Sequence, residues 1–213
     1  MTTLFLQASL LIWVLVTLLW IWSIIIKNVS IVDIFWGVGF VAVNAFYVFG
    51  SGEMNPRKML VLVLVSVWGL RLAGYLAMRN IGQGEDFRYR EFRRKYGAER
   101  YWWVSYFQTF LLQGVLLMIV SLPLLGISTG THPGSLNLID YIGICAWLVG
   151  FAFEAGGDYQ LSRFKGDPKN KGKVLDTGFW KYTRHPNYFG DTAVWWAYAI
   201  FSIAAGSYWQ IIG

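Results

Sequence analysis

The residues best suited to chemistry form a short polar stretch, residues 177–191, directly before an apolar segment. In chain order it contains Lys181, Arg184, His185, Pro186, Asn187, Tyr188 and Asp191. Pro186 fixes its own backbone and disfavours helix at the residue before it, so we expect a helix to begin at about residue 186. The first N–H groups of a helix are free and its dipole is positive there. This end, with Lys181 and Arg184 beside it, therefore suits a phosphate or pyrophosphate.

Asp191 lies one turn inside that predicted helix and would repel a phosphate. It could instead accept a hydrogen bond from a ribose hydroxyl, a carboxamide or a neighbouring guanidinium. The structural alternative is a helix start anchored at the membrane interface, in which Arg184 pairs with Asp191. The residues alone leave the binding site and this alternative equally open.

A second candidate cluster contains Glu154 and Asp158, which are four residues apart and therefore share one face of a helix. Gly156 and Gly157 remove bulk beside them and permit a neighbour or a ligand to approach closely. Two stacked carboxylates repel one another unless a cation lies between them, and Arg71, inside an apolar segment, is the candidate partner. A purely structural buried ion pair is the alternative.

Asp33 opens another apolar segment, and its simplest role is to cap a helix. With Glu154, Asp158 and Asp191 it makes four acids that we expect near one leaflet, facing two basic loops. Ionisable residues at membrane depth are costly and indicate function by default. The four acids therefore predict one polar cavity open to the cytoplasm, which is the strongest argument from the residues for an enzyme.

The composition indicates that the helices carrying these side chains are surrounded by lipid and not by water. Of the 213 residues, 56% are hydrophobic and only 14% are charged, against about 25% charged in a soluble domain. The apolar runs are continuous, as in helices, and about 20 residues cross a bilayer in that form. The predicted fold is all-α, a polytopic membrane helix bundle that forms a single integral membrane domain over residues 1–213. The six predicted spans are residues 4–26, 31–50, 59–78, 104–125, 138–158 and 188–209.

The basic residues set the predicted orientation. Fourteen of the 18 Lys and Arg residues fall in two loops, residues 79–100 and 163–184, and such basic loops face the cytoplasm. Because membrane topology alone accounts for these two basic loops, they are not evidence for nucleic-acid binding, and we exclude nucleic acid as a partner. In the first loop Tyr89, Phe92 and Tyr96 share one helical face, which predicts an amphipathic helix on the inner membrane surface. A wall of a cofactor phosphate pocket is the alternative for this loop.

Metal chemistry is not indicated by the sequence. Cys145 is the only cysteine and lies in an apolar run, while His132 and His185 are expected on opposite sides of the membrane. Because these residues cannot join in one ligand set, we predict no metal site.

The motifs resemble those of a known superfamily. Residues 177–191 look like the C-terminal signature of membrane sterol reductases, and residues 158–168 resemble the segment that precedes it there. Over residues 30–205 the chain is similar to the DUF1295 family, which belongs with the steroid 5α-reductases. The stretches Asp33-Ile-Phe-Trp-Gly and Gly84-Glu-Asp-Phe-Arg-Tyr share in this resemblance. The final motif is specific to the superfamily and not to one substrate.

The resemblance implies a membrane enzyme that binds NADPH on its cytoplasmic side and transfers hydride to a carbon–carbon double bond conjugated to a carbonyl. The reductase-like region would cover about residues 104–213. Asp33 is the implied catalytic acid for the substrate carbonyl, with Tyr75 as a supporting hydroxyl, and burial in an apolar cavity could keep Asp33 protonated. The implied cofactor-binding residues are Asp158, Arg163, Lys165, Lys181, Arg184, His185, Asn187, Tyr188 and Asp191.

Relatives in this superfamily have one more helix and a basic, aromatic tail, so we expect a family-typical seventh helix to be missing at the C-terminus. The alternatives to a reductase are a membrane methyltransferase that uses S-adenosylmethionine, of the isoprenylcysteine carboxyl methyltransferase type, and a noncatalytic relative. The expected partners are membrane lipids and a lipophilic small-molecule substrate from the bilayer. A bacterial inner membrane is favoured over the endoplasmic reticulum, because the chain is compact and has no targeting signal.

Overall fold

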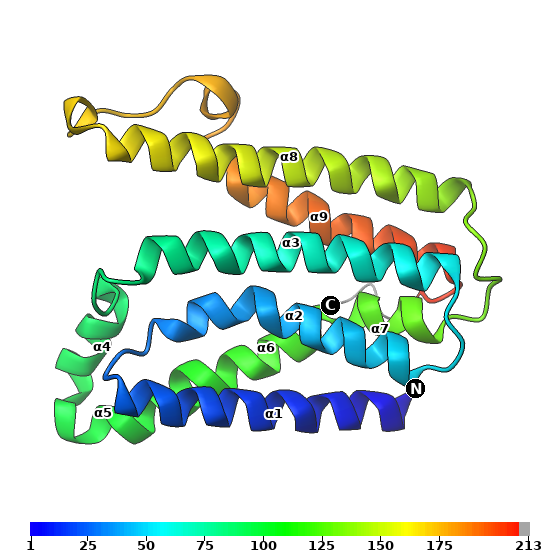
Figure 1. The fold of residues 1–213 in the computed structure, drawn as a ribbon, viewed down its shortest axis with the longest axis horizontal. Helices are drawn as coiled ribbons and strands as arrows, with labels where there is room; N and C mark the ends of the chain where they lie inside the picture. The colour runs from blue at the N-terminus through cyan, green and yellow to red at the C-terminus, as the bar shows by residue number, and fades with distance from the viewer. Residues whose placement is uncertain (209–213) are drawn as a thin grey trace.

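The computed structural model describes residues 1–208, and within them the secondary structure is helical (Figure 1). Among these residues, five helical runs are long and apolar enough to cross a membrane, in keeping with a bundle of about six. The first three are α1 (Thr2–Ile25), α2 (Ile31–Gly50) and α3 (Pro56–Asn80), which coincide closely with the first three predicted spans. They run along the long axis of the molecule (Figure 1).

The fourth predicted span, residues 104–125, is divided in the structure. The helical run begins earlier, with α5 (Ala98–Ser105), widens into the π-helix η1 (Tyr106–Leu111) and continues as α6 (Leu112–Val120). The chain turns at Ser121, and α7 (Leu122–Thr129) follows with a proline in its first turn, where no N–H partner is needed. Residues 123–128 are all buried, so α7 fills the interior of the bundle instead of lengthening the span.

The last two predicted spans form α8 (Leu138–Gly166) and α9 (Pro186–Ala204), which lie side by side (Figure 1). The side chain of Asn137 caps α8 by accepting hydrogen bonds from two N–H groups of its first turn. The connection from α8 to α9 contains two 3₁₀ turns, η2 (Pro168–Asn170) and η3 (Gly178–Lys181). The predicted end of the sixth span at residue 209, and the end of the chain, lie outside the described residues.

Facing glycines let the helices approach closely. A methyl group on Gly37 of α2 would overlap the carbonyl of Gly69 on α3. In the same way, a methyl group on Gly190 of α9 would overlap the backbone of Gly150 and Glu154 on α8. Small residues at such contacts are the usual means of close helix packing in lipid. Because both contacts adjoin the polar residues described below, they bring those residues within reach of one another.

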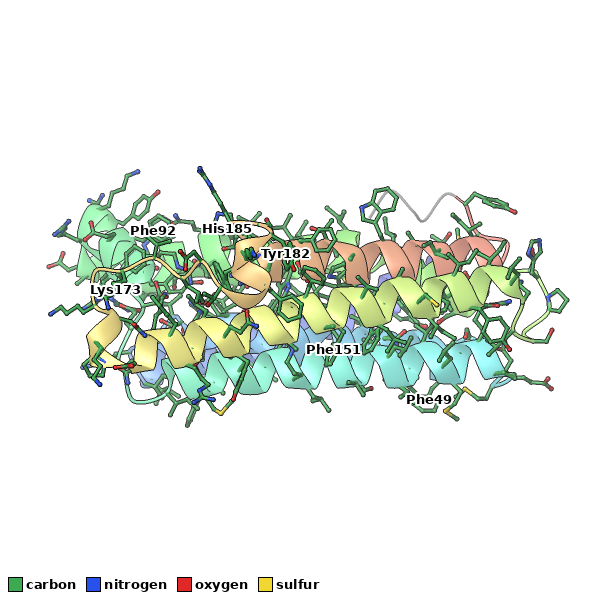
Figure 2. All side chains as sticks on the ribbon, turned by 90° about the horizontal axis from the view of Figure 1, so that it is seen from above. Phe49, Phe92, Phe151, Lys173, Tyr182 and His185 are labelled. Carbon is green, nitrogen blue, oxygen red and sulfur yellow. The ribbon has the colours of Figure 1, made fainter. Side chains whose placement is uncertain are left out.

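The amphipathic helix predicted in the first basic loop is α4 (Phe87–Tyr96), which runs across the ends of the long helices (Figure 1). Tyr89 is buried and Phe92 is partly buried, as the predicted face requires, whereas Tyr96 is exposed. The second basic loop connects α8 to α9 at the same end of the molecule. Lys173 in that loop lies far from Phe49, near the end of α2 (Figure 2).

The opposite end of the bundle is closed by a buried ion pair. Arg57, in the first turn of α3, donates to the two carboxylate oxygens of Asp140 at 2.7 and 2.8 Å. It also donates to the carbonyl oxygens of Pro133 and Ser135. The side chains of Arg57 and Asp140 are only 2% and 0% exposed. This ion pair fixes the loop before α8 onto the start of α3.

Candidate functional site

The four acids that the sequence predicts in one cavity do lie around one. Asp33, Glu154, Asp158 and Asp191 line a cavity of about 710 Å³, which we call the acid pocket. Its walls come from α2, α3, α6, α8 and α9 and from the start of α4. The other residues that line it are Trp36, Leu72, Tyr75, Leu76, Arg79, Asp86, Phe87, Arg88, Gln113, Leu116, Asn187 and Tyr188.

A chain of hydrogen bonds between polar side chains joins three helices at the acid pocket. Arg71 of α3 donates to Glu154 and, at 2.7 Å, to Asp158, both on α8. Glu154 also accepts from the indole N–H of Trp68 at 2.8 Å. Asp158 accepts from the side-chain amide of Asn187, on α9, at 3.1 Å. The predicted pairing of Arg71 with the two stacked carboxylates is therefore confirmed.

Two buried atoms of the side chains in this hydrogen-bonded cluster have no partner among the described residues. Within residues 1–208, neither Nε of Arg71 nor the amide oxygen Oδ1 of Asn187 has a hydrogen bond. Buried polar atoms are nearly always paired, so each exception requires an explanation. Since Asn187 lines the acid pocket, its unpaired oxygen belongs to a residue at the wall of that cavity.

Asp33, the predicted catalytic acid, is held by α4. Its carboxylate accepts from the guanidinium of Arg88 at 2.8 Å and from the hydroxyl of Tyr89 at 2.6 Å. Burial and the neighbouring Asp33 carboxylate raise the pKa of Tyr89, so this hydroxyl stays protonated and donates. Both contacts place Asp33 as a hydrogen-bond acceptor in the structure.

A smaller apolar cavity adjoins the acid pocket. It has a volume of about 370 Å³, and we call it the tryptophan pocket. Asp191 and Trp36 line both cavities and so stand between them. The other residues that line the tryptophan pocket are Val120, Pro123, Thr192, Trp195, Trp196 and Ala199.

Several predicted cofactor residues line a different cavity. Lys165, Arg184 and His185 border a space of about 920 Å³ between the end of α8 and the loop that follows it, which we call the loop pocket. Its other charged lining residues are Asp167, Lys171, Lys173 and Asp176. Positive charge is thus in excess in the loop pocket and suits an anion, whereas carboxylates outnumber cations in the lining of the acid pocket.

The start of α9 separates the two sets of predicted residues. His185 lines the loop pocket, while Asn187, two residues later, lines the acid pocket. The end of α8 lies against this point, since a methyl group on Gly157 would come within 3.2 Å of the backbone nitrogen of Asn187. His185, which Figure 2 shows where the loop meets α9, stacks on Tyr188 with ring centroids 5.2 Å apart.

The remaining predicted residues are more scattered. Arg184 and Asp191 line different pockets and form no ion pair in the described part of the chain. The alternative in which these two residues pair at the start of α9 is therefore not found. Arg163 is exposed on α8 and donates to the hydroxyl of Tyr159 at 3.2 Å. Lys181 is exposed in η3. Neither Arg163 nor Lys181 lines the acid pocket or the loop pocket.

Several groups in or beside the acid pocket are not predicted from the sequence. Arg88 is one basic residue among seven in its loop, and its pairing with Asp33 depends on how α4 folds back. Trp68 has the appearance of another apolar residue, although its position three residues before Arg71 places both on one helix face. Gln113 offers the clearest signal that could have been used, because it is an amide inside an apolar segment.

The chain is similar to proteins of one family and, over a shorter length, to a sterol reductase. The model of the family described as "Protein of unknown function (DUF1295)" matches residues 19–213. An uncharacterized protein of Schizosaccharomyces pombe is 25% identical over 224 residues, which cover 94% of this chain and 65% of that protein. The Delta(14)-sterol reductase of the same yeast is 31% identical over 83 residues, 32% of this chain and 20% of the reductase. The chain thus spans less than two thirds of either relative, and no solved structure matches it.

Proposed function

Because this chain belongs to the DUF1295 family, we propose that it is a membrane-embedded, NADPH-dependent reductase of a carbon–carbon double bond in a lipophilic enone. The observation that supports this proposal best is the acid pocket, where four acids meet an unpaired Asn187 amide oxygen beside a positively charged loop pocket. The partial similarity to a sterol reductase supports the reductase class.

The charges of the two pockets fit the two halves of NADPH, which supplies a hydride from its nicotinamide when bound. Lys165 and Arg184 of the loop pocket would hold its phosphate groups. In the acid pocket, Oδ1 of Asn187 would accept a hydrogen bond from the nicotinamide carboxamide, while Asp158 holds the other side of the same amide. Arg71 keeps Asp158 in place by donating to it at 2.7 Å.

The tryptophan pocket supports a lipophilic substrate. Its walls come from α2, α6, α7 and α9 and are mostly aromatic or aliphatic, so they would bury the apolar body of a flat molecule. Trp196 in this wall is 66% exposed in the isolated chain and would face lipid. A substrate could therefore enter from the bilayer with its polar end toward the acid pocket.

The reaction needs a hydrogen-bond donor at the substrate carbonyl, because negative charge develops on that oxygen as the double bond is reduced. Asp33 is already paired with Arg88 and Tyr89. We therefore assign the donor to the hydroxyl of Tyr75, which lines the acid pocket from α3. Asp33 would instead hold α4, and with it one wall of the pocket, in place.

One observation favours a second candidate, the methyltransferase. The carboxylates of the acid pocket would also suit the positively charged sulfonium of S-adenosylmethionine. The excess of cations in the loop pocket argues for the phosphate-bearing ligand. A direct comparison of the two ligands separates the candidates.

The test is a titration of the purified full chain in detergent with NADPH, NADH and S-adenosylmethionine, followed by thermal stabilisation and nicotinamide fluorescence. NADPH at 100 times its Kd is expected to stabilise the protein by about 2.7 kcal/mol. Asp158→Asn should weaken NADPH binding by about tenfold or more, because it removes a charged partner of Arg71. Glu53→Gln, the equivalent change from carboxylate to amide at an exposed acid that lines none of the three pockets, is the matched control.

Activity is then measured as enone-dependent loss of NADPH absorbance. Stabilisation by S-adenosylmethionine alone would assign the chain to the methyltransferases, and no response to any of the three ligands would support a noncatalytic relative. Tyr75→Phe is expected to lower turnover while NADPH still binds. Full turnover by this variant would remove Tyr75 from the role of donor.

A further inference from the structure

The helix α4 has two chemically different faces. Its inner side is fixed to the bundle, where Tyr89 donates to Asp33 at 2.6 Å and Arg93 donates to both carboxylate oxygens of Glu85 at 2.8 and 3.0 Å. Its outer side presents Arg90 and Arg94, one turn apart and both exposed. The fold therefore uses one side of α4 for attachment and leaves the other open.

The open side has an excess of positive charge. We define the basic face as the exposed cations Arg90, Arg94 and Lys95 of α4 and Arg100 of α5. Within residues 1–208, Arg94 has an ion pair, with the exposed Glu91, and the other three have none. By contrast, Arg88 and Arg93 of the same helix are held by carboxylates. Three cations of the basic face thus have no carboxylate partner among the described residues, although Lys95 lies over the ring of Tyr96, and they can bind an anion.

The basic face lies at the depth of lipid headgroups. Only Gly97 separates α4 from α5, and Ala98 is the first residue of a run apolar enough to cross a membrane. Gly97 has a φ of +81°, which glycine adopts without strain and which permits the sharp turn between the two helices. Because α5 enters the membrane and α4 runs across the ends of the helices (Figure 1), α4 must lie along the membrane surface.

Exposed aromatic residues flank the basic face. Trp102 and Trp103 of α5 are 51% and 45% exposed. Tryptophan side chains at such positions lie at the headgroup level of a bilayer. A small soluble anion has no apolar part that could contact these aromatic rings. A phospholipid, in contrast, contacts the cations with its phosphate and the aromatic rings with its glycerol and acyl chains.

From these observations we infer that the basic face is a binding site for anionic phospholipids. The headgroup phosphate binds Arg90, Lys95 and Arg100, and the acyl chains run down beside α5. The inner side of α4 continues into the acid pocket, whose lining includes Asp86, Phe87 and Arg88. A bound lipid thus steadies one wall of that pocket from outside. The site is independent of which cofactor the pockets bind.

The test measures thermal stabilisation of the full chain in detergent by added phosphatidylglycerol, with phosphatidylcholine and inorganic phosphate as comparison ligands. Phosphatidylglycerol is expected to raise the melting temperature, and the other two are not. Arg90→Gln with Lys95→Gln should weaken the apparent lipid affinity by about 25-fold, since each cation near a charged surface contributes about fivefold. Both side chains are exposed, so the variant is expected to fold.

Two matched variants complete the experiment. Lys27→Gln with Lys169→Gln removes two exposed cations outside α4 and should leave the lipid response unchanged. Arg90→Lys with Lys95→Arg keeps the charge and should retain most of the response. Equal stabilisation by phosphatidylcholine, stabilisation by inorganic phosphate, or an unchanged response of the Gln variant would each overturn the inference. No nicotinamide cofactor is present, so these outcomes are separate from those that test the reductase.

Discussion

The two ends of the bundle each hold an arginine that pairs with buried carboxylates, and the two arginines differ in burial and in how fully they are hydrogen-bonded. At one end, Arg57 gives two hydrogen bonds to Asp140 and one each to two carbonyl oxygens. The carboxylate of Asp140 also accepts from the backbone N–H of Asn137 at 2.8 Å. Every nitrogen of the Arg57 guanidinium is therefore engaged, and the group is closed to any ligand.

At the other end, Arg71 is shared between Glu154 and Asp158, and its Nε is unpaired in the part of the chain that the structure describes. Its side chain is 20% exposed, against 2% for Arg57. The two carboxylates line a cavity. Pairing with buried carboxylates is common to Arg57 and Arg71, so this property alone does not identify a functional arginine. Incomplete hydrogen bonding beside a cavity distinguishes the candidate site from a structural ion pair.

The largest effect is expected from Arg57→Met, which would leave Asp140 buried without its cation. Losing one partner of a buried ion pair costs about 3–5 kcal/mol, so the free energy of unfolding should fall by that amount in a melting experiment. NADPH affinity of the fraction that remains folded should be unchanged. A normal melting temperature, or a selective loss of NADPH binding, would remove the distinction between the two ends.

Arg71→Lys tests the carboxylate cluster at the other end of the bundle. The lysine keeps the charge but cannot donate to Glu154 and Asp158 in the forked arrangement of a guanidinium. We expect NADPH affinity to fall by about tenfold, because a hydrogen bond between charged groups contributes about 1.5–3 kcal/mol. The measurement is a fluorescence titration, with Arg57→Lys as the counterpart that should affect melting more than binding. Unchanged NADPH affinity in Arg71→Lys would argue against a ligand role for this cluster.

The smallest effect is expected from Tyr89→Phe, which removes a single hydrogen bond to Asp33 and leaves Arg88 in place. The free energy of unfolding should fall by about 1 kcal/mol, and turnover should fall more than NADPH affinity if α4 forms a working wall of the acid pocket. Thermal melting and steady-state kinetics on one preparation give both values. A loss of stability with full turnover would assign this hydrogen bond to the fold alone.

The sequence predicts the parts of this molecule that depend on local spacing. Glu154 and Asp158 share a helix face because they are four residues apart. An arginine inside an apolar segment has few possible partners other than such a pair of carboxylates. Asp33 and Asp191 lie in the same cavity as predicted because the acids begin or end helices at one side of the membrane. The lengths of α1, α2 and α3 follow from their apolar runs in the same way.

The sequence does not predict what depends on packing between distant segments. The pairing of Arg88 with Asp33 requires α4 to fold back over the start of α2. The division of the predicted cofactor residues between two pockets arises because α8 packs on the start of α9 through Gly157. That contact separates His185 from Asn187, although only one residue lies between them. The short buried helix α7 likewise follows from a turn at Ser121 inside a run that reads as continuous.

The π-helix η1 accommodates one residue more in its turn than an α-helix would at the same place. Removing a single residue from this segment would restore ordinary α geometry and leave the following helix in its present rotation, whereas the same deletion at Leu112, in the first turn of α6, would rotate the residues after it by about 100°. Gln113, which lines the acid pocket, and Gly114, which lies opposite Val16 of α1, would keep their places only in the first case. Single-residue differences in length among relatives should therefore fall within residues 106–111 and avoid α6.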